Sequence, residues 1–272
     1  MSTLRRSAAL IAALCAVAAH AGLKMTTEMK RKGKASTFTM QVEGKNLRGD
    51  MTKEDAGGPG GAFISDGDAK KFVMIDYAKK EYHEITQEQI KAMRAKMDGA
   101  MAQMKEKLAQ LPPEQRKKIE AAMGQTQGQY KSMMPDEKYT RASGSKTVAG
   151  YKCDLYTVES EGKKVADACL IPWSELKGVV DREQLKQTMD AMTEVWSGFG
   201  MDTRMGERSP QAMMKAWGLS DGVPGWRKSV KEGDEASEST LTSLTKGAVP
   251  HSTFEPPAGF TKKTMGEKMG EK

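Results

Sequence analysis

Four methionines lie within twelve positions of this sequence, and their thioether sulfurs could coordinate a metal ion. They recur at steps of three and four residues, at Met93, Met97, Met101 and Met104. A helix would therefore place the four thioethers on neighbouring turns of one face. Thioether sulfur is a soft ligand that suits Cu(I). The spacing thus allows two interpretations, a copper site or an apolar helical face.

The apolar face explains this segment better than a copper site does. Copper clusters usually also recruit His or Cys, and neither occurs between residues 86 and 111. The methionines also continue a stripe of ordinary apolar residues at the same helical spacing. The stripe consists of Ile90, Met93, Met97, Met101, Met104 and Leu108. We expect it to bind an apolar ligand, because flexible methionines repack around different shapes. Cu(I) coordination by the four methionines is the alternative, and no other cofactor is expected.

The sequence offers little for catalysis, and we expect no enzymatic activity. Only His83 and His251 follow the first twenty-one residues, and neither stands near a nucleophile in a recognisable motif. The signatures of serine hydrolases, zinc proteases and P-loop proteins do not occur. Asp66-Gly67-Asp68 resembles the start of a calcium loop but lacks the later carboxylates, so a tight turn is expected there.

Two helical blocks must position the apolar side chains. Thr86 and Gln89 form a capping-box pattern, and Pro112-Pro113 stops a helix, which predicts a helix over 86–111 and a weaker one to about residue 124. Asp181 and Gln184 repeat the capping pattern before a second stripe, and Ser209-Pro210 opens a short third helix. The second stripe adds Met189, Met192 and Trp196 to the expected ligand-binding face.

The rest of the chain has the period-two alternation of strands. Alternating segments separated by turn residues extend from Leu23 to Ile85 and return after residue 137. The later strands are expected over 138–142, 151–158 and 163–171, with a hairpin over 226–246. We predict an α+β fold with an antiparallel sheet, as one domain over 22–262 with helical insertions at 86–124 and 174–218. Residues 263–272 are expected to be a disordered tail.

Two cysteines flank the turn at Glu161-Gly162 and predict a cross-strand disulfide. In an antiparallel hairpin, a turn centred on Glu161 would set Cys153 directly opposite Cys169. The bond would close a loop of 15 residues, worth about 3 kcal/mol in the chain-entropy model. A redox dithiol is the rival interpretation, but the pair lacks Cys-x-x-Cys spacing and a neighbouring histidine.

The first twenty-one residues predict export. Arg5 and Arg6 precede an apolar stretch, and Ala19-His20-Ala21 has the small-residue pattern of a cleavage site, so residues 1–21 are expected to be a signal peptide cleaved after Ala21. Its removal would lower the net charge from +7 to +5. The export signal predicts a periplasmic protein whose mature chain has no transmembrane segment. The mild, evenly mixed charge predicts that it binds no nucleic acid.

Several short motifs resemble the bacterial family called domain of unknown function 4412. They are the segment 66–76, the end of the methionine-rich helix at 111–114, the segment 147–153 and the closing segment 254–260. That family is similar in pattern to the periplasmic lipoprotein-carrier (LolA-like) superfamily. The resemblance implies a strongly curved antiparallel β-sheet, an unclosed half-barrel, with helical insertions packed on its concave face. In the carriers, that concave face receives acyl chains.

The expected function is therefore non-enzymatic binding of a lipid, an acyl chain or another apolar ligand in the periplasm, between a curved sheet and the methionine-rich helices. Two alternatives remain open. One is periplasmic handling of Cu(I) by the clustered methionines, and the other is an envelope scaffold or stress protein that binds other envelope proteins.

Overall fold

The computed structural model describes residues 22–52, 59–110, 112, 115, 137–197, 219–230 and 236–263. Several predicted segments lie outside these residues. They are the signal peptide over 1–21, the weaker helix after residue 112 apart from residue 115, the short helix that starts at Ser209, and the tail from residue 264.

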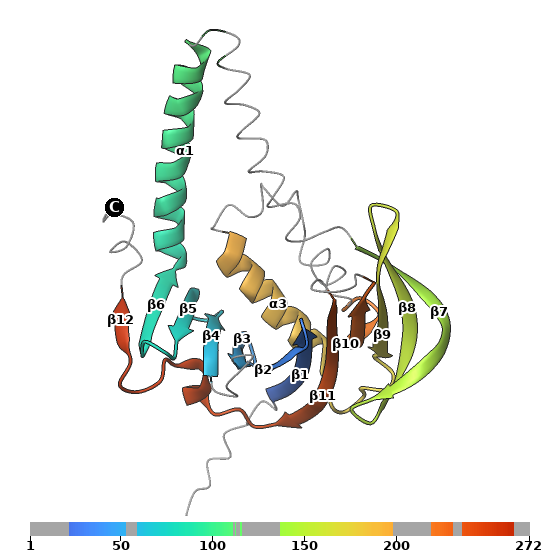
Figure 1. Ribbon diagram of the computed structural model, residues 1–272. Coiled ribbons are helices and arrows are strands. Elements are labelled where there is room, and N and C mark those ends of the chain that lie inside the picture. Colours follow the sequence, from blue (N-terminus) through green and yellow to red (C-terminus); the bar gives the residue numbers. More distant parts are fainter. Residues whose placement is uncertain are drawn as a thin grey trace, which may run out of the picture.

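The described strands form a single 12-stranded sheet. The strands are β1 (Gly22–Arg31), β2 (Lys34–Glu43), β3 (Asn46–Thr52), β4 (Pro59–Asp66), β5 (Lys71–Asp76), β6 (Glu81–Thr86), β7 (Glu137–Val148), β8 (Tyr151–Ser160), β9 (Lys163–Pro172), β10 (Gly222–Ser229), β11 (Ser237–Gly247) and β12 (Thr261–Lys263). Their spatial order is β12-β6-β5-β4-β3-β2-β1-β11-β10-β9-β8-β7. All neighbours are antiparallel except β12 and β6. The sheet is strongly curved and unclosed (Figure 1), which confirms the predicted α+β half-barrel.

Two-residue turns ending in glycine set the register of three hairpins. Lys32-Gly33, Ala149-Gly150 and Glu161-Gly162 all have positive φ at both positions, between 52° and 84°. Two consecutive residues with positive φ match the right-handed twist of the flanking strands, as in type I′ turns. Glycine adopts this conformation without a steric cost, which explains its second place in each turn.

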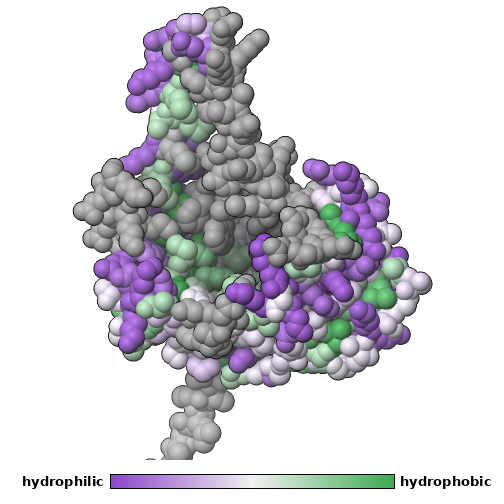
Figure 2. Space-filling model, in the orientation of Figure 1, coloured by the Kyte–Doolittle hydropathy of each residue, from purple (hydrophilic) through white to green (hydrophobic). Residues whose placement is uncertain are grey.

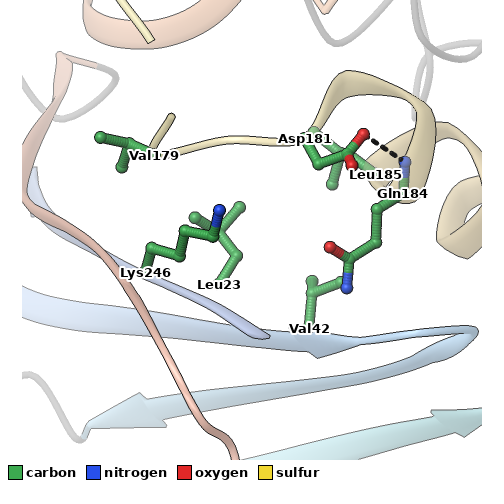
Figure 3. Close-up of a pocket in the computed structure, with 7 residues that line it drawn as sticks. All are labelled: Leu23, Val42, Val179, Asp181, Gln184, Leu185 and Lys246. Atoms are coloured by element: carbon green, nitrogen blue, oxygen red, sulfur yellow. Dashed lines mark hydrogen bonds between the residues drawn. The ribbon is translucent and has the colours of Figure 1, made fainter. Parts of the chain in front are cut away.

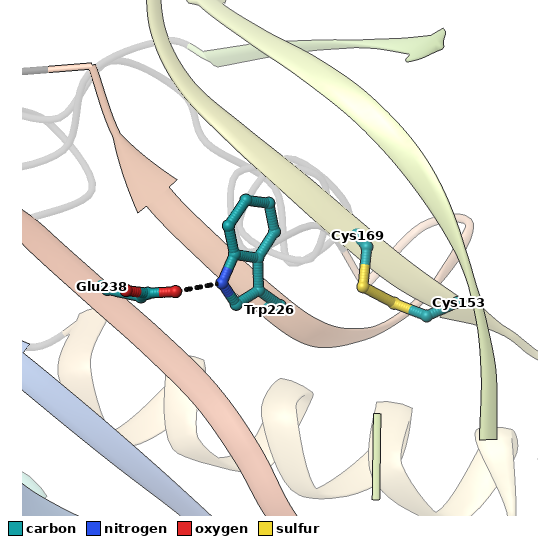
Figure 4. Close-up of a disulfide and its surroundings, with 4 residues drawn as sticks. All are labelled: Cys153, Cys169, Trp226 and Glu238. Atoms are coloured by element: carbon teal, nitrogen blue, oxygen red, sulfur yellow. Dashed lines mark hydrogen bonds between the residues drawn. A yellow bond between two sulfur atoms is a disulfide. The ribbon is translucent and has the colours of Figure 1, made fainter. Parts of the chain in front are cut away.

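The predicted disulfide forms, but the predicted pairing of its cysteines is wrong. Cys169 lies opposite Leu155, because the turn centre falls between Glu161 and Gly162 and a bulge at Val158/Glu159 shifts the register further. The cysteines are therefore diagonal neighbours on one face, with their Cα atoms 5.4 Å apart and their sulfurs bonded (Figure 4). Both are fully buried beside Trp226, whose indole N–H donates to Glu238 at 2.6 Å.

Helix α3 (Arg182–Ser197) packs on one face of the sheet, which we call the concave face. It lies over β2, β3 and β4 (Figure 1). Thr188 ties it to the sheet by donating from Oγ1 to the carbonyl of Gly44 at 2.6 Å. Its apolar side chains join those of the sheet in the main core, which contains Leu23, Val42, Leu47, Cys153, Cys169, Leu185, Met189, Met192 and Leu241 among others.

Helix α1 (Gln87–Ala109) starts directly after β6 and projects beyond the sheet (Figure 1). The predicted capping box is confirmed: Gln89 N donates to Thr86 Oγ1 at 3.2 Å, and Thr86 N donates to Gln89 Oε1 at 3.0 Å. Ile85 and Ile90, on either side of the cap, are both buried, an arrangement typical of a hydrophobic staple. Among the described residues, no helix is long and apolar enough to cross a bilayer.

The C-terminal segment covers the opposite face of β3–β6. Val249 and Phe254, from the segment around the 3-10 helix η2 (His251–Phe254), pack on Ile64, Val73 and Ile75 in a second core. β12 then extends the sheet edge beside β6. This face of β3–β6 is therefore occupied by the chain itself.

Candidate functional site

The concave face carries a continuous set of apolar side chains across neighbouring strands. Strand pairing places Leu23 opposite Val42, Met25 opposite Met40, and Thr27 opposite Phe38. Because side chains alternate along a strand, these six residues share one face. Figure 2 shows hydrophobic side chains gathered in the hollow at the middle of this view, with hydrophilic ones on the rims.

Three aromatic rings extend this surface across β2, β4 and β5. The ring centroids of Phe38 and Phe63 are 6.4 Å apart, and those of Phe63 and Phe72 are 5.8 Å apart, with both pairs stacked. Gly49 on β3 makes this possible, because a Cβ there would collide with the rings of both Phe63 and Phe38. The missing side chain lets the rings lie over the backbone of β3. Near the rings, Met51 and Met74 remain exposed on the same face.

A first hollow lies between the start of α3 and the ends of β1, β2 and β11 (Figure 3). Its volume is about 160 Å³. Four apolar and three polar side chains line it: Leu23, Val42, Val179, Leu185, Asp181, Gln184 and Lys246. This hollow therefore combines an apolar wall with polar groups at its mouth.

The polar groups of the first hollow are not equivalent. Asp181 Oδ1 accepts from the backbone N–H groups of Glu183 at 2.9 Å and Gln184 at 3.1 Å, and so caps α3. In contrast, the side-chain Nε2 of Gln184 is buried and finds no hydrogen-bond partner in the part of the chain that the structure describes. Figure 3 shows the Gln184 side chain reaching from α3 toward Val42, and the Lys246 ammonium near Leu23.

A second hollow of about 200 Å³ lies on the same face, farther along β1 and β2. It is lined by Met25, Thr27, Phe38, Met40, Leu219, Pro224, Gly225, Trp226, Ser239 and Leu241. Its wall is almost entirely apolar, and the methionine pair supplies flexible chains that can repack around a guest. A slim apolar chain fits this lining by its chemistry.

A third hollow, of about 370 Å³, lies between β7 and the β10–β11 pair. Its charged groups are already paired: Arg227 donates to both carboxylate oxygens of Glu137, at 2.7 and 2.8 Å. Burial raises the pKa of the Tyr139 phenol beside them, so this hydroxyl stays protonated at neutral pH. This ion pair links β10 to β7 across the curved sheet. The described charged groups that line the hollow are therefore paired with each other and not available to a ligand.

The methionine stripe of α1 divides into buried and exposed parts. Ile90 and Leu108, near its ends, are buried, and Met101 is half-buried. Met93 and Met104 are 42% and 39% exposed. The side chain of Met97 lies outside the described residues. The stripe is therefore a helical face as predicted, and its ligand-binding role stays a prediction.

The predicted residues of α3 lie in the core. Met189 and Met192 are 3% and 6% exposed and belong to the main core. The side chain of Trp196 lies outside the described residues. The hollows beside this helix are lined instead by residues that the sequence reasoning did not single out, chiefly Met25, Met40 and Lys246. The β1–β2 hairpin places Met25 and Met40 on one face, and the pairing of β11 with β1 adds Lys246 to it.

The described residues offer no evident metal centre built from the usual side chains. Nowhere among them do three His, Cys, Asp or Glu residues come together to hold an ion. His83 is half-buried on β6, and His251 is exposed at the start of η2. The concave face presents apolar hollows with a small number of polar groups, an arrangement typical of sites that bind small ligands.

No protein-family model and no curated protein matches the sequence. Solved structures with similar arrangements include an uncharacterized conserved protein from Thermus thermophilus, with a TM-score of 0.42, 6% identity, and coverage of 90% of this chain and 91% of that one. The MucA/MucB complex of Pseudomonas aeruginosa gives a TM-score of 0.36 and 13% identity, with 88% of this chain and 57% of that chain covered. The structure of PNGF-II gives a TM-score of 0.37 and 8% identity, with 90% of this chain and 31% of that chain covered.

These likenesses are distant. All three TM-scores lie below 0.5 and all three identities below 25%, so they carry no argument about ligand or partner. The chain also spans little more than half of the matched MucB chain and about a third of PNGF-II. The half-barrel architecture rests on the strand order of this chain, and membership of the domain of unknown function 4412 family stays a prediction.

Proposed function

We propose that this protein is a non-enzymatic binding protein of the periplasm that holds the apolar chain of a lipid or related molecule on its concave face. One observation carries the proposal. Among the described residues, Met25, Thr27, Phe38 and Met40 stay half-buried on this face and line the second hollow, whereas the opposite face of β3–β6 is covered by the C-terminal segment. An apolar surface that stays open on a folded protein favours a binding role.

The size and lining of the hollows favour a chain over a compact ring system. At about 160 and 200 Å³, each is smaller than the roughly 300–1,000 Å³ typical of pockets for drug-sized ligands. The two lie in succession along β1 and β2, so a narrow, extended ligand could contact both. Burial of its methylene groups would supply the affinity, at about 0.8 kcal/mol for each fully buried CH₂.

Filling the second hollow tests this function. Thr27 lines it, whereas Thr26 points to the opposite face of the same strand and pairs with Thr39. We expect Thr27→Phe to weaken the binding of monolauroyl glycerol, a neutral single-chain lipid, about tenfold or more. Thr26→Phe is the matched control and should bind as the wild type does. Calorimetric titration below the aggregation concentration of the lipid measures both.

Equal affinity of the two variants, or no binding by the unmodified protein, would contradict the proposal. The heat capacity change offers a second readout, because burial of apolar surface on binding makes it negative.

A further inference from the structure

Lys246 is a charged residue among apolar ones on the concave face. It lies opposite Leu23 on β1, and Leu244 and Leu241 precede it on the same face of β11. Its ammonium has neither an ion-pair nor a hydrogen-bond partner within the described part of the chain. Other lysines near α3 are paired: Lys70 contacts Glu194 and Lys186 contacts Asp190.

A second donor in the same hollow is also unused. Gln184 Nε2 is buried without a hydrogen-bond partner among the described residues, and a buried donor left unpaired costs free energy. An acceptor that entered the hollow would relieve this cost. The backbone N–H groups of Glu183 and Gln184 are already occupied by Asp181, so the end of the helix is not itself the site.

The carboxylate of Asp181 is the one opposing charge that lines the hollow. Its Oδ1 atom is engaged by two backbone N–H groups, and the partial positive charge at the start of a helix, roughly half a unit, offsets part of its charge. The Lys246 side chain is exposed to solvent, so its ammonium is open to an incoming ligand. The donors available to a ligand therefore favour an acceptor that carries negative charge.

The apolar hollow begins where these polar groups end. Leu23 lines the first hollow, and Met25 and Thr27, the next residues on the same face of β1, line the second. At a strand rise of about 3.3 Å per residue, the distance from Leu23 to Thr27 is about 13 Å. A charged head and an apolar chain are thus accommodated in sequence along one strand.

We propose that the ligand is an anionic single-chain amphiphile. Its carboxylate or phosphate head lies at the first hollow against Lys246 and Gln184, and its chain runs along β1 and β2 toward the second hollow. This inference rests on the proposed function and specifies its ligand class.

Three probes with the same chain length test the head group: dodecanoate, dodecyl phosphate and monolauroyl glycerol. Each is titrated calorimetrically, below its aggregation concentration, into protein purified from cells that express the full chain. The variant Lys246→Met keeps the length of the side chain and removes its charge. Lys24→Met is the matched control, because Lys24 is exposed on the opposite face of β1.

We expect Lys246→Met to lower the affinity for at least one of the two anions about tenfold or more. The affinity for monolauroyl glycerol should change less than about twofold. The anion that binds more tightly to the wild type identifies the head group. Lys24→Met should change none of the affinities. Asp181→Asn provides a second variant, since asparagine also caps helices, and it should strengthen anion binding by removing the opposing charge.

If Lys246→Met lost affinity equally for the anions and the neutral lipid, or lost none for either, the assignment of the head group would be overturned. The proposed function would stay intact. Weaker anion binding in Asp181→Asn would also overturn the assignment, because removal of the opposing charge should strengthen the binding of an anionic head at the first hollow. Failure of all three probes to bind the wild type would overturn this inference and the proposed function together.

Discussion

Gly49 lies directly beneath the ring of Phe63. A Cβ at position 49 would stand 2.9 Å from Phe38 Cε2 and closer still to Phe63 Cε1. The φ of Gly49 is not positive, so the requirement is for space and not for an unusual backbone conformation. The row of aromatic rings on the concave face therefore depends on the absence of a side chain here.

Gly49→Ala is accordingly expected to lower the free energy of unfolding by about 1–3 kcal/mol, the usual cost of overpacking. The matched control is Gly61→Ala on β4, where the nearest atom to a Cβ is the Ile75 carbonyl oxygen at 3.5 Å. That variant should be unchanged or more stable by about 0.5 kcal/mol, because alanine loses less conformational entropy. Urea denaturation compares the two, and equal effects would contradict the packing described.

The Cys153–Cys169 bond should contribute to stability in the oxidised protein. Replacement of both cysteines by alanine is expected to cost about 3 kcal/mol, from the loop of 15 residues that the bond closes. Reductant supplies the control: dithiothreitol should destabilise the wild type and leave the double variant unaffected. Two free thiols in the denatured, unreduced wild type would show that the bond is absent.

Methionine oxidation should follow exposure. Met51 and Met93 are 47% and 42% exposed, whereas Met189 and Met192 are in the core. Limited treatment with hydrogen peroxide, followed by peptide mass mapping, should therefore convert the first pair to sulfoxides well before the second. Similar rates for the four would mean that α3 does not stay packed on the sheet.

The ion pair between Lys70 and Glu194 links the turn after β4 to α3, at 2.7 Å. The hydrogen bond and the charge of Lys70 lower the pKa of Glu194 below its ordinary value of 4.5. Because the pKa of Glu194 is lower in the folded state than in the unfolded state, the ion pair stabilises the fold fully at a pH above the unfolded-state pKa. This stabilisation is lost as the pH falls through the folded-state pKa.

Lys70→Met should return the Glu194 pKa to its ordinary range, which carbon-detected NMR titration of the carboxyl group measures. Lys177→Met, on an exposed residue outside this pair, is the control and should leave the titration unchanged. A Glu194 titration that is the same in the wild type and in Lys70→Met would contradict the ion pair.

Local signals made much of the fold predictable. The capping box at Thr86 and Gln89 predicted the start of α1, because both halves of that motif are close in sequence. Strand alternation likewise predicted the strands between Leu23 and Ile85. The α+β architecture follows from the same local patterns.

Features that depend on distant contacts were not predictable. The turn centre between Glu161 and Gly162 and the bulge at Val158/Glu159 together move Cys169 from Cys153 to Leu155, and no local pattern announces a bulge. The hollows at Lys246 and Trp226 arise only when β11 and β10 pair beside β1. Lys246 follows Leu244 at the spacing of one strand face, and this was the available sequence signal for the first hollow, because a charge at an apolar position is informative.

Native mass spectrometry of detergent-free protein, purified from cells that express the full chain, tests the central claim most directly. The account predicts that part of the wild-type protein carries a bound lipid-sized molecule that organic extraction recovers. Thr26→Phe should retain this molecule, and Thr27→Phe should lose it. Empty wild-type protein in repeated preparations, with no uptake of added dodecanoate or monolauroyl glycerol, would contradict a ligand-binding concave face.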